Sequence, residues 1–237
     1  MSSLLYSIIL QWKVDIRNKD ILLTYYLVPI LFYIFVGNVF TSVMPNIEET
    51  LTQSMVIFAI LMGTSIGSPQ PIADVFTTDI KKGYQVSNIP LGSVVLVNYI
   101  SAFVHMLIVS CIIIFSAPLI FQTAIPTSLS FWIGLVLYII TSVFIGSCLG
   151  VLVKSSSKLT MISQVVFLPS MMLSGIMFPN NMLPDVFQTI SKLFPATWGF
   201  ELMCSKTILT TNIYILLIIS LICYVVLCVQ INRVKKI

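Results

Sequence analysis

Two short serine patterns are the first candidates for chemistry in this sequence. Residues 63–67 (GTSIG) match the G-x-S-x-G pattern of hydrolases, and residues 155–158 (SSSK) match S-x-x-K. The first pattern makes a nucleophile only where a strand, a sharp turn and a helix expose the serine above a sheet. Here it ends a long apolar segment, and the second pattern is a polar stretch between two such segments. We interpret both as chance matches and predict no catalytic residue.

His105 is the single histidine, and it lies inside an uncharged apolar segment. An ionisable side chain within a membrane is a functional candidate by default. We favour a neutral histidine that is hydrogen-bonded to a neighbouring helix. A zinc site needs about four nitrogen, sulfur or oxygen ligands, and the five cysteines show no C-x-x-C spacing. We therefore predict no metal site and interpret the cysteines as small packing residues.

Two pairs of glycines have a spacing typical of closely packed membrane helices. Gly63 and Gly67 form one G-x-x-x-G pattern, and Gly146 and Gly150 form another. Small residues four positions apart allow two helix backbones to approach closely in lipid. We predict a helix-packing role for all four glycines.

The composition excludes a water-soluble globule. Hydrophobic residues make up 58% of the 237 residues, charged residues make up 8%, and the mean hydropathy is +1.05. Soluble domains carry about 25% charged residues. The formal net charge of +4 is not gathered on a soluble basic face, so we predict no nucleic-acid binding. The expected fold is an all-α polytopic membrane protein, with one transmembrane domain over residues 1–237.

Uncharged apolar segments of about 20 residues, the length that crosses a bilayer core, recur along the chain. The six spans that we predict are 21–43, 51–70, 94–117, 131–153, 159–178 and 211–231. No Asp, Glu, Lys or Arg lies near the centre of any of them. Charges at such positions mark ion and proton pathways, so their absence disfavours a proton-driven antiporter.

Lysine and arginine are distributed unevenly between the two sides of this arrangement. Two of the twelve, Lys192 and Lys206, fall on the outer side, and ten fall on the side that holds both termini. The ten are Lys13, Arg17, Lys19, Lys81, Lys82, Lys154, Lys158, Arg233, Lys235 and Lys236. Because cytoplasmic loops carry an excess of basic residues, we predict a multi-pass plasma-membrane protein with cytoplasmic N- and C-termini.

Residues 1–20 precede the first span and show helical periodicity. The apolar stripe contains Leu5, Ile8, Ile9, Trp12 and Ile16. The polar residues of another face are Ser7, Gln11, Asp15 and Asn18. We predict an elbow helix lying in the inner interface, with Trp12, Lys13 and Arg17 at headgroup level. The alternative is a plain cytoplasmic extension of span one.

The outer connection between spans five and six is apolar rather than hydrophilic. Its stripe consists of Leu183, Val186, Phe187, Ile190, Leu193 and Phe194. Pro184 suits a first helical turn, and Pro195 would end the helix. We predict helices that lie on the outer surface or re-enter the membrane, where protein or water must satisfy the backbone.

The order of these parts resembles the type-2 ABC exporter permeases, and the resemblance covers essentially the whole chain. Residues 79–91 (DIKKGYQVSNIPL) resemble the family's charged loop after span two, which contains a glycine and ends in Pro-Leu. Residues 169–179 (PSMMLSGIMFP), with the prolines at 184 and 195, resemble its Ser-Gly-x-x-Phe-Pro pattern before the last span.

This resemblance implies a transport subunit that works with other chains. A second permease, identical or related, would complete the transport path. A separate cytoplasmic P-loop ATPase would bind ATP and Mg²⁺, because this chain has no P-loop motif and would bind no cofactor itself.

The resemblance also implies roles for particular residues. The cytoplasmic loop 74–92 would be the coupling helix, and its expected ATPase contacts are Asp79, Lys81, Lys82, Gly83 and Tyr84. The outer helices would shape the exit gate, with Phe178, Pro179, Phe194, Pro195, Trp198 and Glu201.

Spans one and five offer aromatic, methionine and uncharged polar side chains for a transport path. The residues that we assign to it are Tyr33, Asn38, Gln164, Met171 and Met172. A methionine-rich surface adapts to varied apolar shapes, which predicts hydrophobic or amphipathic cargo such as peptides or drugs. Two alternatives remain: a secondary transporter or channel without an ATPase, and, with less support, an intramembrane enzyme.

Overall fold

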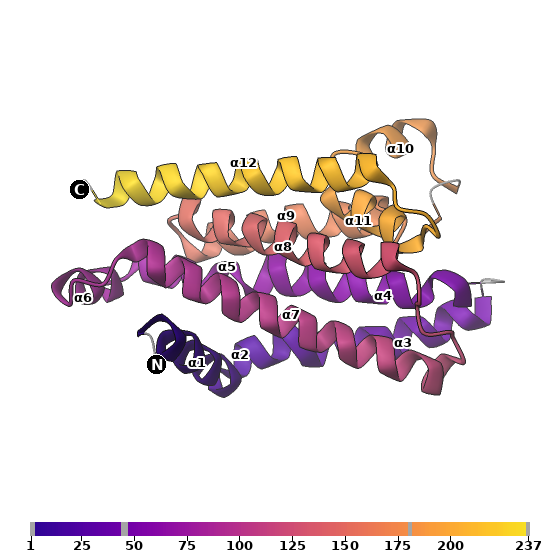
Figure 1. Cartoon of the computed structure of the whole chain (residues 1–237), viewed down its shortest axis with the longest axis horizontal. Helices are drawn as coiled ribbons and strands as arrows, with labels where there is room; N and C mark the ends of the chain where they lie inside the picture. The colour runs from indigo at the N-terminus through magenta and orange to yellow at the C-terminus, as the bar shows by residue number, and fades with distance from the viewer. Residues whose placement is uncertain (1–2, 44–46, 180–181, 236–237) are drawn as a thin grey trace.

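Most of the chain folds into long helices that lie side by side (Figure 1). The structure is a computed structural model and describes residues 3–43, 47–179 and 182–235. Within these ranges the protein is helical and contains no strand. An apolar helix satisfies its own backbone hydrogen bonds, so this architecture suits a chain with so few polar side chains.

Six rods run along the molecule. The first consists of α2 (Lys19–Leu22), η1 (Leu23–Leu27) and α3 (Val28–Val43), and the second of α4 (Glu48–Met62), η2 (Gly63–Gly67) and α5 (Pro69–Thr77). The others are α7 (Leu91–Phe121), α8 (Leu129–Leu152), α9 (Ser156–Leu173) and α12 (Thr210–Lys235). The shorter helices are α1 (Ser3–Arg17), α6 (Ile80–Val86), α10 (Asp185–Ser191) and α11 (Pro195–Cys204).

The two ends of the molecule carry different short helices. Helices α1 and α6 lie at the end where α12 finishes, which we call the α6 end (Figure 1). The α7–α8 connection and α10 lie at the other, the α10 end. Consecutive rods therefore run antiparallel, and the chain returns to the α6 end after an even number of passes.

Among the described residues, five helical segments are long and apolar enough to cross a membrane. They are Lys19–Val43, Glu48–Thr77, Leu91–Phe121, Leu129–Leu152 and Thr210–Arg233. They match predicted spans one, two, three, four and six. The predicted fifth span, 159–178, corresponds to α9, which ends at Leu173 and is not among the five. The chain bends after α9, where Gly175 has a φ of 81°, so the six-span count remains a prediction.

The second rod is longer than the sequence suggested. The predicted span ended at residue 70, but α5 continues the helix to Thr77. Pro69 does not break it, because proline is tolerated in the first turn of a helix. The expected coupling loop 74–92 therefore begins inside α5, and the projecting part starts at residue 78.

The core is built around α4. Its residues 54–61 are all buried, and 78% of the apolar stretch in its rod is enclosed by protein, against 22% for α12. A helix that is apolar on all sides is stable only when covered all round. Helices α3, α7 and α11 all pack against α4, whereas α12 lies at the edge of the bundle.

The four glycines with G-x-x-x-G spacing lie where elements approach closely. Gly146 and Gly150 of α8 lie against η2 and α5, and a Cβ atom on Gly150 would meet the Pro69 carbonyl oxygen at 2.6 Å. Gly63 and Gly67 are in η2, beside Met106 and Tyr25. Two π-helical turns, η1 and η2, thus lie next to each other in the bundle, a type of irregularity that is frequent at functional sites.

Candidate functional site

Helix α6 projects beyond the bundle between α5 and α7 (Figure 1). Its base is packed, because Tyr84 contacts the cluster of Val75, Leu91 and Val94. The chain turns back at Asn88, whose φ of 54° is left-handed, a conformation that asparagine adopts more readily than most residues. Residues 78–90, which we call the α6 handle, therefore form an ordered projection.

Apolar side chains of the α6 handle face outward. Ile80, Val86 and Ile89 are 49%, 84% and 42% exposed. Exposed apolar groups that cluster on a projecting element are typical of a protein–protein contact. The sequence analysis did not single out these three residues, although each lies within the segment that it assigned to coupling.

The five predicted ATPase contacts lie on the same short segment as these apolar residues. Asp79 and Lys82 are exposed and form an ion pair of 2.7 Å. Gly83 is also exposed, while Lys81 and Tyr84 are partly buried. An exposed ion pair contributes only about 0–1 kcal/mol to stability, so these charges are free to engage a partner at little cost to the fold.

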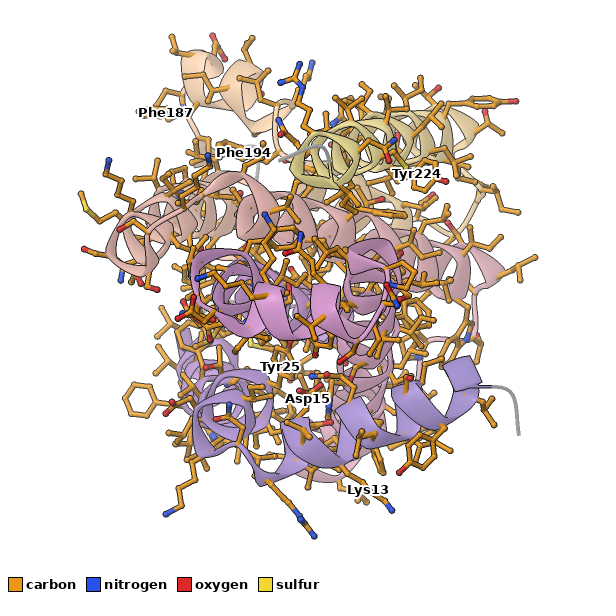
Figure 2. The ribbon with its side chains drawn as sticks, turned by 90° about the vertical axis from the view of Figure 1, so that its left-hand side faces the viewer. Lys13, Asp15, Tyr25, Phe187, Phe194 and Tyr224 are labelled. Carbon is orange, nitrogen blue, oxygen red and sulfur yellow. The ribbon has the colours of Figure 1, made fainter. Side chains whose placement is uncertain are left out.

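Helix α1 lies across the bundle with Asp15 facing inward. Figure 2 shows Asp15 pointing toward Tyr25 inside the bundle and Lys13 pointing away. Asp15 is only 4% exposed. Its carboxylate accepts hydrogen bonds from the Gln11 amide at 2.8 Å and the Ser101 hydroxyl at 2.5 Å. Part of the polar face of α1 thus packs against α7.

The apolar stripe of α1 lies partly on the outside instead. Leu5, Ile9 and Ile16 are 49%, 40% and 38% exposed, Trp12 is partly buried, and Lys13 and Arg17 are exposed. This distribution is what a helix in a membrane interface would present to lipid. The exposed and protein-facing sides of α1 are thereby distinguished.

His105 is completely buried beneath α1. Its Nδ1 atom shares a hydrogen bond of 2.6 Å with the Tyr26 hydroxyl, so the expected bond to a neighbouring helix is present. Its Nε2 atom is 3.8 Å from an Asp15 carboxylate oxygen, and the ring stacks on Trp12 with centroids 6.2 Å apart. We call Trp12, Asp15, Tyr26, Ser101 and His105 the buried polar cluster.

The sequence analysis missed most of the buried polar cluster. Asp15 and Ser101 are 86 positions apart, and helical periodicity reports only which residues share a face. One signal was available. Asp15 is the only acidic residue of α1, and His105 the only histidine of the chain, and lone polar groups in an apolar protein need each other as partners.

Helices α3 and α9, which carry the predicted transport path, both pack against α4. The ring of Phe58 on α4 stacks on Phe32 of α3 at 3.8 Å and meets Phe167 of α9 at 5.9 Å. On the exposed side of α3, a groove of about 540 Å³ runs past Phe35 and Asn38. The inner sides of α3 and α9 therefore meet the same aromatic ring of α4, and their other sides are exposed.

The five path residues do not all lie on those exposed sides. Asn38, Gln164 and Met172 are exposed, and Met171 is partly buried. Tyr33 is 1% exposed. Its hydroxyl accepts a hydrogen bond from Ser116 at 3.2 Å, so within one chain Tyr33 belongs to the packing between α3 and α7.

Helix α11 is inserted into the α10 end of the bundle. The Ser130 hydroxyl of α8 donates a hydrogen bond to the Leu202 carbonyl at 2.7 Å. A Cβ atom on Gly199 would lie 2.8 Å from the Tyr138 ring. Helix α10, by contrast, exposes Val186 and Phe187 by 67% and 45%. The outer connection thus has one surface helix and one packed helix.

Two of the predicted gate residues link α11 to its neighbours, Trp198 to the end of α10 and Glu201 to α12. The Trp198 indole donates to the Lys192 carbonyl at 2.9 Å, and the Asn212 amide donates to the Glu201 carboxylate at 3.2 Å. Phe194, Pro195, Trp198 and Glu201 are partly buried. Phe178 and Pro179 lie on the bend after α9, where Phe178 is 39% exposed.

No group of three or more His, Cys, Asp or Glu side chains suitable for a metal ion occurs in the described parts of the chain. Comparison with known proteins gives one match. The model of the family described as ABC-2 type transporter matches residues 4–208. No curated protein and no solved structure matches the chain.

Proposed function

The chain belongs to the ABC-2 type transporter family, and on that premise we propose that it is the membrane subunit of an ATP-driven exporter. The family match, which runs from α1 to the segment before α12, carries this proposal. Membership makes the protein a multi-pass transport subunit rather than an enzyme. ATP and Mg²⁺ would be bound by a separate P-loop ATPase, because the sequence has no phosphate-binding glycine loop.

The α6 handle is proposed to transmit the action of that ATPase. Its exposed Ile80, Val86 and Ile89 would fill an apolar recess on the ATPase, with Asp79 and Lys82 at the rim. Such a division, apolar at the centre and polar at the rim, is typical of protein interfaces. Because α5 and α7 are directly joined to the handle, a movement of the handle would tilt two rods of the bundle.

The transport path is proposed to lie between this chain and a second permease, identical or related. The exposed sides of α3 and α9 offer Asn38, Gln164 and Met172 among apolar side chains. A surface of this kind suits hydrophobic or amphipathic cargo, such as peptides or drugs, of variable shape. Closure of the ATPase dimer would separate these surfaces toward the α10 end, where α10 and α11 would form the exit.

The orientation that we propose places the α6 end in the cytoplasm. This end carries α1, α6 and the end of α12, and with them most of the lysines and arginines of the chain. With α9 counted as a short fifth span, the protein would cross the plasma membrane six times and keep both termini inside.

The second candidate function is a secondary transporter or channel that acts without an ATPase. The buried polar cluster favours it, because an Asp15 oxygen lies 3.8 Å from His105 Nε2 inside the bundle, and ionisable side chains within a membrane protein often mark ion or proton pathways. The α6 handle argues against it, since a stand-alone carrier has no use for an exposed apolar projection.

Co-purification tests the two functions against each other. We would solubilise the full-length protein gently, capture it, and assay the eluate for a P-loop protein and for ATP hydrolysis. The exporter predicts an ATPase partner with the wild-type chain and its loss when Lys81 and Lys82 are both replaced by glutamate. A wild-type chain that purifies alone and without ATPase activity would contradict the exporter and favour the carrier.

A further inference from the structure

A small cavity lies inside the bundle where η2, α8, α9 and α11 meet. Its volume is about 20 Å³. Five of the residues that line it carry a hydroxyl group, and these are Thr64, Ser65, Tyr138, Ser142 and Ser170. All five are at most 5% exposed, and the rest of the lining is apolar. The cavity is therefore a polar site enclosed in an otherwise apolar bundle, and it is separate from the buried polar cluster and from the α3 groove.

The Tyr138 hydroxyl is buried and has no hydrogen-bond partner among the described residues. The base of its ring packs on α11, where a Cβ atom on Gly199 would lie 2.8 Å from a ring carbon. The hydroxyl end faces the cavity, since Ser142, which lies near it without completing a hydrogen bond, lines the same space. Buried polar groups in folded proteins are nearly always bonded to protein or to ordered water, so the partner of this hydroxyl must lie in the cavity.

Two hydroxyls on the facing helices can accept a hydrogen bond but have no proton left to donate. The Thr64 hydroxyl donates to the Ile60 carbonyl at 2.7 Å, and the Ser170 hydroxyl donates to the Val166 carbonyl at 2.6 Å. A hydroxyl has one proton and two lone pairs, so both oxygens can still accept. Ala196, which also lines the cavity, lies in the first turn of α11, where N–H groups have no acceptor within the helix. The cavity thus offers acceptors on η2 and α9 and donors on α8 and α11.

We propose that this cavity binds one ordered water molecule, which accepts a hydrogen bond from Tyr138 and donates to Thr64 and Ser170. The size fits, because a cavity needs roughly 10–15 Å³ to hold a water molecule, whereas pockets for organic ligands span about 300–1,000 Å³. Buried waters typically make about three hydrogen bonds to polar groups that lack other partners. A cation fits less well, because no carboxylate among the described residues lines the cavity and the start of α11 is the positive end of a helix dipole.

The position of the water gives it a structural consequence. It would bridge Tyr138 of α8 to Thr64 of η2 and Ser170 of α9, and the Tyr138 hydroxyl has no direct bond to either. Helix α11 begins at Pro195, on the edge of the same cavity. The water would therefore join three rods where the inserted outer helix starts. The inference does not depend on the cargo, the ATPase or the second permease, because it concerns the packing of this chain alone.

Tyr138→Phe tests whether the hydroxyl has a partner, because the substitution removes that group alone. With water bound, the full-length protein in detergent should melt about 2–4 °C lower, the shift expected for one lost hydrogen bond in a chain of this size. Without water, the variant would melt at the same temperature or higher, since an unpaired buried hydroxyl is costly, and this result would overturn the proposal. A melting temperature of the wild-type protein that falls when choline chloride replaces sodium chloride would overturn water in favour of a cation.

Ser170→Ala tests whether α8 and α9 share one partner. Combined with Tyr138→Phe, it should lower the melting temperature by less than the sum of the two single shifts, because each variant alone already breaks the same bridge. The matched control is Ser110→Ala. Ser110 is buried, donates to the Met106 carbonyl of its own helix at 2.7 Å, and does not line the cavity, so it should combine additively with Tyr138→Phe. Strict additivity of Ser170→Ala with Tyr138→Phe would overturn the bridge.

Radiolytic footprinting of the wild-type protein provides a test that needs no folded variant. X-rays produce hydroxyl radicals from bound water, and the radicals oxidise the side chains beside it. The control is Phe131, which lies on the same helix, is 0% exposed against 1% for Tyr138, and does not line the cavity. Both kinds of ring react readily with hydroxyl radicals, so Tyr138 should be oxidised clearly faster than Phe131. Equally slow oxidation of the two rings would overturn the proposal.

Discussion

Helices α1 and α6 lie at the same end of the molecule and differ in the contacts that their side chains make with the rest of the chain. Asp15 of α1 points inward and accepts a 2.5 Å hydrogen bond from Ser101 of α7. The α6 handle instead points outward, with Val86 84% exposed. The buried carboxylate of the first helix is satisfied by its own chain, and the second helix projects beyond the bundle with apolar side chains that its own chain does not cover.

This difference indicates that α1 contributes to the stability of the fold, whereas the α6 handle contributes to the binding of a partner. A buried carboxylate without partners would be costly, so the α1 contacts must form whenever the protein folds. Exposed apolar side chains on the handle add little to the fold and become useful only against another surface. Changes in α1 should therefore affect stability, and changes on the handle should affect partner binding.

The largest expected effect is the loss of ATPase binding by Val86→Asp. Central apolar residues of an interface commonly contribute about 2 kcal/mol or more, which corresponds to roughly thirtyfold in affinity. Titration of the purified permease with the ATPase would measure this loss. The melting temperature should stay that of the wild type, because Val86 is exposed. A lower melting temperature with unchanged ATPase affinity would mean that the handle contributes to stability and not to ATPase binding.

Asp15→Ala should have the next largest effect, and on stability alone. It leaves the Gln11 amide and the Ser101 hydroxyl without their acceptor, and each unsatisfied buried group costs about 1–3 kcal/mol. Thermal unfolding in detergent should show a melting temperature lower by about 2–4 °C for each kcal/mol. Asp15→Asn keeps an acceptor and should lose less. If folded Asp15→Ala lost affinity for the ATPase, α1 would contribute to ATPase binding as well as to stability.

Tyr26→Phe should have a smaller effect in the same direction. The variant keeps the ring and removes the 2.6 Å hydrogen bond to His105, which is worth about 0.5–1.5 kcal/mol. The same thermal assay measures it. Combined with Asp15→Ala, it should give less than the sum of the single effects, because both residues contact His105. Strict additivity would mean that the buried polar cluster is not one unit.

The smallest effect is expected from Asp79→Asn. Its ion pair with Lys82 joins two side chains that are 88% and 77% exposed, and such pairs contribute about 0–1 kcal/mol. The melting temperature should not change measurably. ATPase affinity should change only slightly and in a salt-dependent way, since a charge at the rim of an interface acts mainly on the association rate. A drop in melting temperature as large as that of Asp15→Ala would show that the handle supports the bundle.

The sequence was sufficient for the features that depend on local composition. Apolar length located five membrane-crossing helices, because a helix of about 20 apolar residues is specified by its own side chains. The handle was placed to within a few residues by its charges and by Pro90. The end of α5 was missed because Pro69, which looks like a terminator, sits at a helix start where it does no harm.

The burial of Asp15 could not be predicted from local composition. Amphipathic periodicity gave the correct faces of α1, but which face meets protein depends on what α7 offers 86 positions later. The insertion of α11 is similar, because it depends on two glycines that leave space at the contact, Gly134 of α8 beside Met203 and Gly199 of α11 beside the Tyr138 ring. Local patterns specify elements, and contacts between distant elements decide their orientation.

The most direct test of the account is photo-crosslinking from the tip of the handle in intact cells. A benzophenone amino acid would replace Val86 in one variant and Val43 in a matched control, since both valines are exposed, by 84% and 72%, and lie at opposite ends of the molecule. The account predicts a crosslink from position 86 to a P-loop ATPase and none from position 43. A crosslink to the ATPase from position 43 alone, or none from position 86 while the complex is present, would contradict it.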